Sequence, residues 1–204
     1  MIHERAMPTM TSASNFADLA LRLRDFARGQ GGLAAVEFAM VLPFMLMAYL
    51  GGIEIGDGVA IDRKVAITTR SVADLASRFT TIANSDMANI LGASSTIIAP
   101  YSPTPLAVTV SQVMIDTKGN ATVAWSDANS NATPRAKNSA VTLPGTLATP
   151  CAQGAVCSYI LGEVKYNYTP TLGYVMTGTW TLTNQIFMSP RNSACVIRNT
   201  SCTP

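Results

Sequence analysis

Four cysteines and one histidine are the side chains of this chain that could most readily catalyse, bind a metal or carry redox chemistry. Cys151, Cys157, Cys195 and Cys202 are spaced C-x5-C and C-x6-C, and His3 lies far from them. These spacings are not those typical of zinc sites. Two disulfides account for them better. Of the three pairings that four cysteines allow, we expect the short-loop pairs, the first cysteine with the second and the third with the fourth.

Catalysis is disfavoured by the types and positions of the remaining polar residues. A Ser/His/Asp or Cys/His set needs a histidine base, and the sequence has none after residue 3. We interpret Asp116 and Asp127 as turn residues at a hairpin and Glu163 as a residue on the polar face of a strand. No glycine-rich stretch has the pattern of a nucleotide-binding loop. We therefore predict that the protein is not an enzyme and has no cofactor or metal.

Composition indicates contact with lipid. Of the 204 residues, 48% are hydrophobic and only 13% are charged, whereas about a quarter are charged in a typical soluble domain. The net charge of +2 is too small to indicate binding to nucleic acid. We expect a lipid membrane as one partner and no nucleic acid.

Residues 33–55 form an apolar segment whose only charged side chains are Glu37 and Glu54. As a helix it would be about 34 Å long, which is enough to cross a bilayer. Pro43 removes one backbone hydrogen bond and should kink this helix. Basic residues flank the segment about equally. Because disulfides persist in oxidising compartments, we place the N-terminus in the cytoplasm and the C-terminal domain on the other side.

The glutamate inside this apolar segment needs an explanation, because a carboxylate within a bilayer costs about 2.5–3.5 kcal/mol. Glu37 is either close enough to the helix end to reach water or has a charged partner. Gly31 and Gly32 precede the segment, and a flexible glycine pair fits a protease cleft. Cleavage between Gly32 and Leu33 would create an ammonium group one helical turn from Glu37. The amine of one subunit could then pair with Glu37 of its neighbour and set their register.

The segment that begins GGLAAVEFAMVLPFML and continues to residue 78 resembles the TadE/TadF family of pilin-like proteins from tight adherence (Tad) pilus systems. The family's hallmark is a glycine, four residues, and Glu-Phe or Glu-Tyr before an apolar helix. Here these positions are Gly32, Glu37 and Phe38, and Leu42 and Pro43 match the family's usual Leu-Pro.

The resemblance implies a minor pilin or pseudopilin-like component of a Tad (Flp-type) pilus, matured by a prepilin peptidase after Gly32. Its implied partners are that peptidase, the major Flp-type pilin, other pseudopilins and the inner-membrane Tad assembly platform. The implied location is the bacterial inner membrane, as a single-pass protein that either stays there or enters the extracellular pilus. The alternative is an unprocessed, membrane-anchored β-rich binding module such as an adhesin. Processing at Gly32 distinguishes the two.

After the apolar segment, apolar positions recur in alternating steps of four and three residues. We expect this packing stripe to lie against the protein's own sheet, with an intermolecular seam as the alternative. The charged residues between these positions should face solvent. The stripe consists of Ile61, Val65, Thr68, Val72, Leu75, Phe79 and Ile82, and the charged residues are Asp62, Arg63, Lys64, Asp74 and Arg78.

Four segments in the C-terminal half read as β-strands. LAVTVSQVMID and ATVAWSDA flank the turn TKGN, and SYILGEVKYNYTP and WTLTNQIFMSP follow a polar loop. We predict an α+β fold in which a long N-terminal transmembrane and amphipathic helix precedes a small antiparallel four-stranded sheet, as in pilins. The expected parts are a cytoplasmic leader (1–32), a transmembrane helix (33–55), an amphipathic helix continuation (56–98) and a disulfide-bonded β-rich domain (99–204).

Overall fold

The computed structural model describes residues 24, 31–145, 147, 150–153, 155–170, 173 and 177–198. It comprises two compact units, residues 1–50 and 51–204. The expected leader therefore lies almost wholly outside the described residues, as does Cys202.

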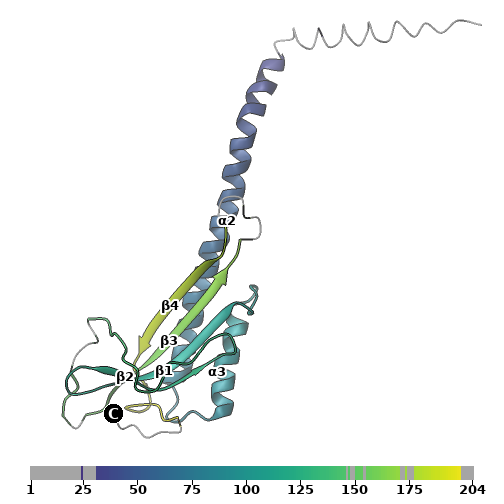
Figure 1. The fold of residues 1–204 in the computed structure, drawn as a ribbon. Helices are drawn as coiled ribbons and strands as arrows, with labels where there is room; N and C mark the ends of the chain where they lie inside the picture. Colours follow the sequence, from purple (N-terminus) through teal and green to yellow (C-terminus); the bar gives the residue numbers. More distant parts are fainter. Residues whose placement is uncertain are drawn as a thin grey trace, which may run out of the picture. The chain divides into compact units, whose positions relative to one another are not determined.

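Two helices and four strands make up the described structure (Figure 1), and their order confirms the predicted α+β fold. The strands form one antiparallel sheet in the order β2-β1-β3-β4, and the predicted pair of β1 and β2 occurs in it. The elements are α2 (Gly31–Ser77), α3 (Asn84–Ile97), β1 (Leu106–Ile115), β2 (Ala121–Ala128), β3 (Cys157–Tyr168) and β4 (Trp180–Met188).

The helical region is interrupted, unlike the continuous helix expected up to residue 98. Helix α2 ends at Ser77 and α3 begins at Asn84. Between them, Thr81 pairs with Ile197, and the Ile82 amide donates to the Ile197 carbonyl at 2.9 Å. The backbone of this connection is thus used for pairing with a distant segment. A carboxylate oxygen of Asp86 then accepts the Ala83 amide at 3.0 Å and caps α3.

The main hydrophobic core lies between the helices and one face of the sheet. The packing stripe, which runs from α2 into the connection after it, contributes to this core, as the sequence favoured, together with Met87 and Ile90 of α3. Alternate residues of β1 and β3 supply the sheet side, including Val108, Val110 and Val164. The fully buried stripe positions are Ile61, Val65, Thr68, Val72 and Ile82. The half-buried positions are Leu75 and Phe79.

Helix α2 packs tightly against β3 at Gly162. A Cβ atom added to this glycine would lie 2.9 Å from the Cβ of Ala73 and 3.1 Å from the carbonyl oxygen of Thr69. Ordinary carbon–carbon contacts are about 3.5–4.0 Å. Only glycine therefore permits this separation between helix and sheet.

A second, smaller core covers part of the opposite face of the sheet. Val113, Ile115 and Leu161 form it with side chains of the long connection after β2, such as Val141. The β1–β2 register shifts between Gln112 and Val113. Because such a bulge adds a residue to one strand, it changes which residues of the strand face each core.

The β1–β2 turn is organised by Asp116. One carboxylate oxygen accepts the amides of Lys118 and Asn120, each at 2.8 Å, and the other accepts the Asn120 side chain at 2.8 Å. Gly119 has φ +85°, a value that glycine adopts without strain. The predicted hairpin at TKGN is confirmed. The hydrogen bonds from Asn120, side chain first, lower the pKa of Asp116.

Candidate functional site

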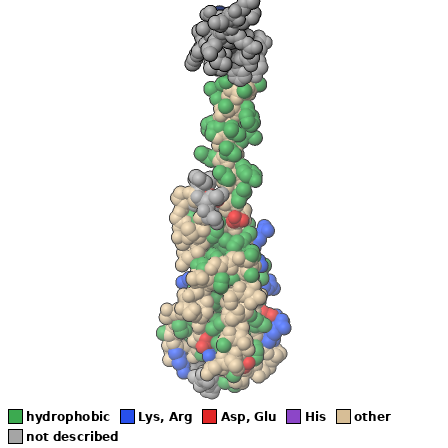
Figure 2. All heavy atoms as spheres, turned by 90° about the vertical axis from the view of Figure 1, so that its right-hand side faces the viewer, with side chains coloured by type: hydrophobic (Ala, Val, Ile, Leu, Met, Phe, Trp, Pro, Cys, Tyr) green, Lys and Arg blue, Asp and Glu red, His purple; other side chains and the backbone are tan. Residues whose placement is uncertain are grey.

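The apolar part of α2 carries the family motif, and its side chains are exposed on every side of the helix. From residue 33 to residue 49 each side chain is exposed, and Figure 2 shows hydrophobic side chains over the visible face of this part of the helix. By length and composition alone α2 could cross a membrane. A surface this apolar is stable only against lipid or other helices. Its large exposed residues are Leu33, Val36, Phe38, Met40, Val41, Leu42, Phe44, Met45, Leu46, Met47 and Tyr49.

Glu37 interrupts this apolar surface one turn after Leu33, and its side chain is exposed. Phe38 beside it is 59% exposed. Gly31 and Gly32 lie within the first turn of α2 and are helical, whereas the sequence suggested an extended pair. The first amides of a helix have no partner within it, so these glycines add little to the helix's stability.

Helix α2 changes its environment near residue 51. Gly51 and Glu54 are buried, and Glu54 is only 2% exposed. From Ile61 onwards the packing stripe is buried in the domain. The change comes close to residue 55, where the sequence suggested that the membrane-spanning part ends. Pro43 lies inside the helix, and the kink expected there remains a prediction.

One predicted disulfide is confirmed. Cys151 and Cys157 are joined, with their Cα atoms 5.7 Å apart, and the bond fixes the start of β3 to the preceding loop. Cys195 is also disulfide-bonded. The predicted partner of Cys195, Cys202, lies outside the described residues, so that pairing remains a prediction.

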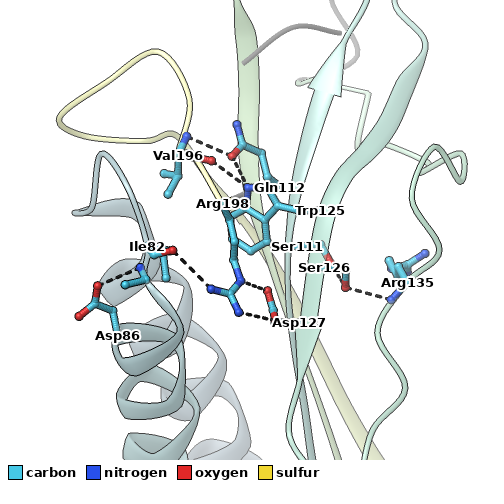
Figure 3. A network of polar contacts seen from close by, with 11 residues as sticks. Ile82, Asp86, Ser111, Gln112, Trp125, Ser126, Asp127, Arg135, Val196 and Arg198 are labelled. Atoms are coloured by element: carbon cyan, nitrogen blue, oxygen red, sulfur yellow. Dashed lines mark hydrogen bonds and ion pairs between the residues drawn. The ribbon is translucent and has the colours of Figure 1, made fainter. Parts of the chain in front are cut away.

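The segment before and after Cys195 is fixed to the domain by a buried polar network (Figure 3). The amide oxygen of Gln112 accepts the Trp125 indole N–H at 2.9 Å and the Val196 amide at 3.0 Å. The same indole N–H also donates to the Val196 carbonyl at 2.8 Å. Gln112 is 1% exposed, so these bonds are shielded from water.

Two carboxylates interpreted as turn or surface residues have structural partners. Asp127 accepts Nη2 of Arg198 at 2.8 Å, and Nη1 of Arg198 also reaches the Ile82 carbonyl at 3.4 Å. Glu163 forms a two-pronged pair with Arg135 at 2.6 and 2.7 Å. The hydrogen bonds that Arg135 donates to Glu163 raise the pKa of Arg135. Both pairs connect loops to the sheet.

Three of the charged residues that were expected to face solvent, Lys64, Asp74 and Arg78, also have defined partners. Asp74 accepts Arg78 at 2.6 Å and is paired with Arg191. Lys64 donates to the Ile97 carbonyl at 3.2 Å. Sequence spacing could suggest the first pair, because the two residues lie four apart on a helix. The pairs with distant segments have no such signal.

Within the described part of the chain, no group of three or more His, Cys, Asp or Glu side chains could hold a metal ion.

Residues 32–78 match the family model described as TadE-like protein. The match contains Gly32, Glu37, Phe38 and Pro43, the positions on which the sequence resemblance rests, and it confirms that resemblance over this segment. No curated protein and no solved structure matches the chain. The apolar helix of this chain is therefore a TadE-like segment, which indicates a protein associated with the Tad pilus.

Proposed function

We propose that this protein is a minor pilin or pseudopilin-like structural component of a Tad pilus, matured by prepilin peptidase cleavage after Gly32. The observation that carries the proposal is the TadE-like match over residues 32–78, in which Glu37 interrupts a helix otherwise covered by exposed apolar side chains. The proposed partners are the prepilin peptidase, the major Flp-type pilin, other pseudopilins and the inner-membrane assembly platform.

Cleavage gives Glu37 a role that an uncleaved anchor would not provide. Leu33 would become the first residue, and its ammonium would lie about 6 Å along the helix axis from Glu37. In a bundle of such helices, the ammonium of one subunit and Glu37 of the next can neutralise each other away from water. A misaligned pair would leave a carboxylate buried in the apolar bundle, so the pair would select one axial register.

The domain after residue 55 fits a component exposed outside the cytoplasm. Its Cys151–Cys157 bond is typical of proteins in an oxidising compartment. We propose that the N-terminus is cytoplasmic, that α2 crosses the inner membrane once, and that the sheet lies on the periplasmic side.

The proposal is tested by intact mass and N-terminal sequencing of the protein from membranes that contain or lack the peptidase. We expect a chain that starts at Leu33 only when the peptidase is present. The variant Gly32→Arg should remain uncut, because a large charged side chain replaces the residue at the cleavage point. Gly31→Arg, with the same charge one position earlier, is the control and should still be cut. An intact leader in both membranes would refute processing and would favour an unprocessed membrane-anchored binding module.

A further inference from the structure

A pocket of about 450 Å³ lies beside α2 where the helix enters the domain. It is lined by two helical residues, by the segment that precedes β1 and by the end of β3. No lysine or arginine is among the described residues that line it. Its lining residues are Asp57, Ile61, Tyr101, Ser102, Pro105, Tyr166, Asn167, Tyr168 and Thr169.

The chemistry of this pocket suits a cation. Three tyrosine side chains line it together with Asp57, whose carboxylate is exposed. None of the ion pairs among the described residues involves Asp57. Burial first, and then the charges of Asp57 and Glu54, raise the pKa of Tyr168, which agrees with a negative potential around this ring. Aromatic faces combined with a carboxylate are a known means of recognising ammonium groups.

The position of the pocket indicates which kind of molecule carries the ammonium group that it binds. If residues 33–55 span the membrane, as the proposed function requires, Asp57 lies about 3 Å along the helix axis beyond the apolar segment. That is the depth of lipid head groups, where tyrosine and tryptophan are enriched. Trp180 lies opposite Tyr168 in the β3–β4 register and is 51% exposed, so it can also contact the membrane surface.

We propose that this pocket binds the ammonium head group of a membrane lipid such as phosphatidylethanolamine, in the leaflet next to the folded domain. The ammonium lies against the tyrosine faces and pairs with Asp57. An anionic lipid such as phosphatidylglycerol has no ammonium and is repelled by the carboxylate of Asp57. The inference rests on the membrane topology in the proposed function, and it adds a lipid contact that holds the domain at a fixed height.

Carbodiimide coupling tests the site directly. The full-length protein is placed in vesicles of phosphatidylethanolamine and phosphatidylglycerol, and a carbodiimide joins carboxylates to nearby amines with loss of water. Asp57 and Asp62 lie in the same tryptic peptide, residues 29–63, so Asp62 is an internal control that is exposed but outside the pocket. We expect about tenfold more lipid adduct at Asp57 than at Asp62, the factor that a favourable cation–π and charge contact gives.

Variants distinguish lipid binding in the pocket from coupling that reflects only proximity to the membrane. Tyr101→Leu removes a half-buried ring and should reduce the adduct at Asp57 to the level at Asp62. In native mass spectrometry, Asp57→Asn should lower retention of phosphatidylethanolamine, whereas Asp62→Asn should not. Equal adducts at both aspartates, or coupling of Asp57 to a protein lysine, would overturn the lipid site. Leader cleavage is measured separately. If the leader is cleaved normally but no lipid adduct forms at Asp57, only the lipid site is refuted. If the leader stays intact but the adduct is strong, only processing is refuted.

Discussion

Replacing Gly162 by alanine should destabilise the domain, because the added Cβ would lie 2.9 Å from the Cβ of Ala73 and 3.1 Å from the carbonyl oxygen of Thr69. Reaching a normal carbon–carbon distance requires α2 and β3 to separate by about 0.6 Å or more. Neither neighbour can rotate away, since one is a methyl group and the other is helix backbone. Overpacking of this kind costs about 1–3 kcal/mol.

Part of that cost is offset in the unfolded state, where alanine is less flexible than glycine by about 0.4–1 kcal/mol. We therefore expect a net loss of about 1–2 kcal/mol in the free energy of unfolding. With a urea slope of about 2 kcal/mol per molar, the midpoint falls by about 0.5–1 M. The measurement is urea unfolding of the full-length protein in detergent micelles, followed by tryptophan fluorescence.

Two further variants identify the cause. Ala73→Gly combined with Gly162→Ala removes the closest contact, so the double variant should be more stable than the sum of the single effects predicts, by about 1 kcal/mol. Gly92 of α3 has open space where a Cβ would lie, and Gly92→Ala should raise the midpoint, because alanine favours a helix by about 1 kcal/mol. An unchanged midpoint for Gly162→Ala, or purely additive effects in the double variant, would refute the close-approach argument.

Glu37→Leu should leave membrane insertion intact or improved and abolish incorporation into filaments, as measured by immunoblotting of sheared pili; normal incorporation would refute the register role. Gln112→Met removes the acceptor of the buried Val196 amide, so the free energy of unfolding should fall by about 1–3 kcal/mol. Hydrogen exchange at the Val196 amide should also become faster, and unchanged exchange would contradict the network. The lowered pKa of Asp116 means that its contribution to stability is present above pH 3.8 and is lost as the pH falls through the lower folded pKa. Asp116→Ala should therefore lower the urea midpoint more at pH 7 than at pH 2. An equal difference at both pH values would refute the turn's electrostatic role.

The strands could be predicted from the sequence because each is a local pattern. In β3, Val164, Tyr166 and Tyr168 alternate with polar residues, and the buried face of the strand follows that alternation. The packing stripe of α2 could be found for the same reason. Its periodicity does not depend on any distant residue, only on a core being present on one side.

The break between α2 and α3 could not be predicted in this way. The sequence from Arg78 to Ala83 has no proline or glycine to stop a helix, and the helix ends because Thr81 and Ile82 pair with Ile197. The partners of Asp127 and Glu163 were missed for the same reason, since both arginines come from distant loops. One local signal existed. Gln112 is a polar residue in the apolar strand LAVTVSQVMI, and a buried amide of this kind needs hydrogen-bond partners.

The network around Gln112 and Arg198 determines when this domain can finish folding. Its hydrogen bonds to Val196 and Arg198 join residues 71 to 116 positions apart in the chain, and the Arg191–Asp74 bond spans 117. Helix α2 is synthesised long before the residues that secure the connection after it. Until those residues have been synthesised, the packing stripe and Trp125 remain partly exposed to solvent. Contacts between such distant positions also form slowly. The newly made chain thus passes through a period in which it needs protection from aggregation, and that period ends only when residues 191–198 have been added.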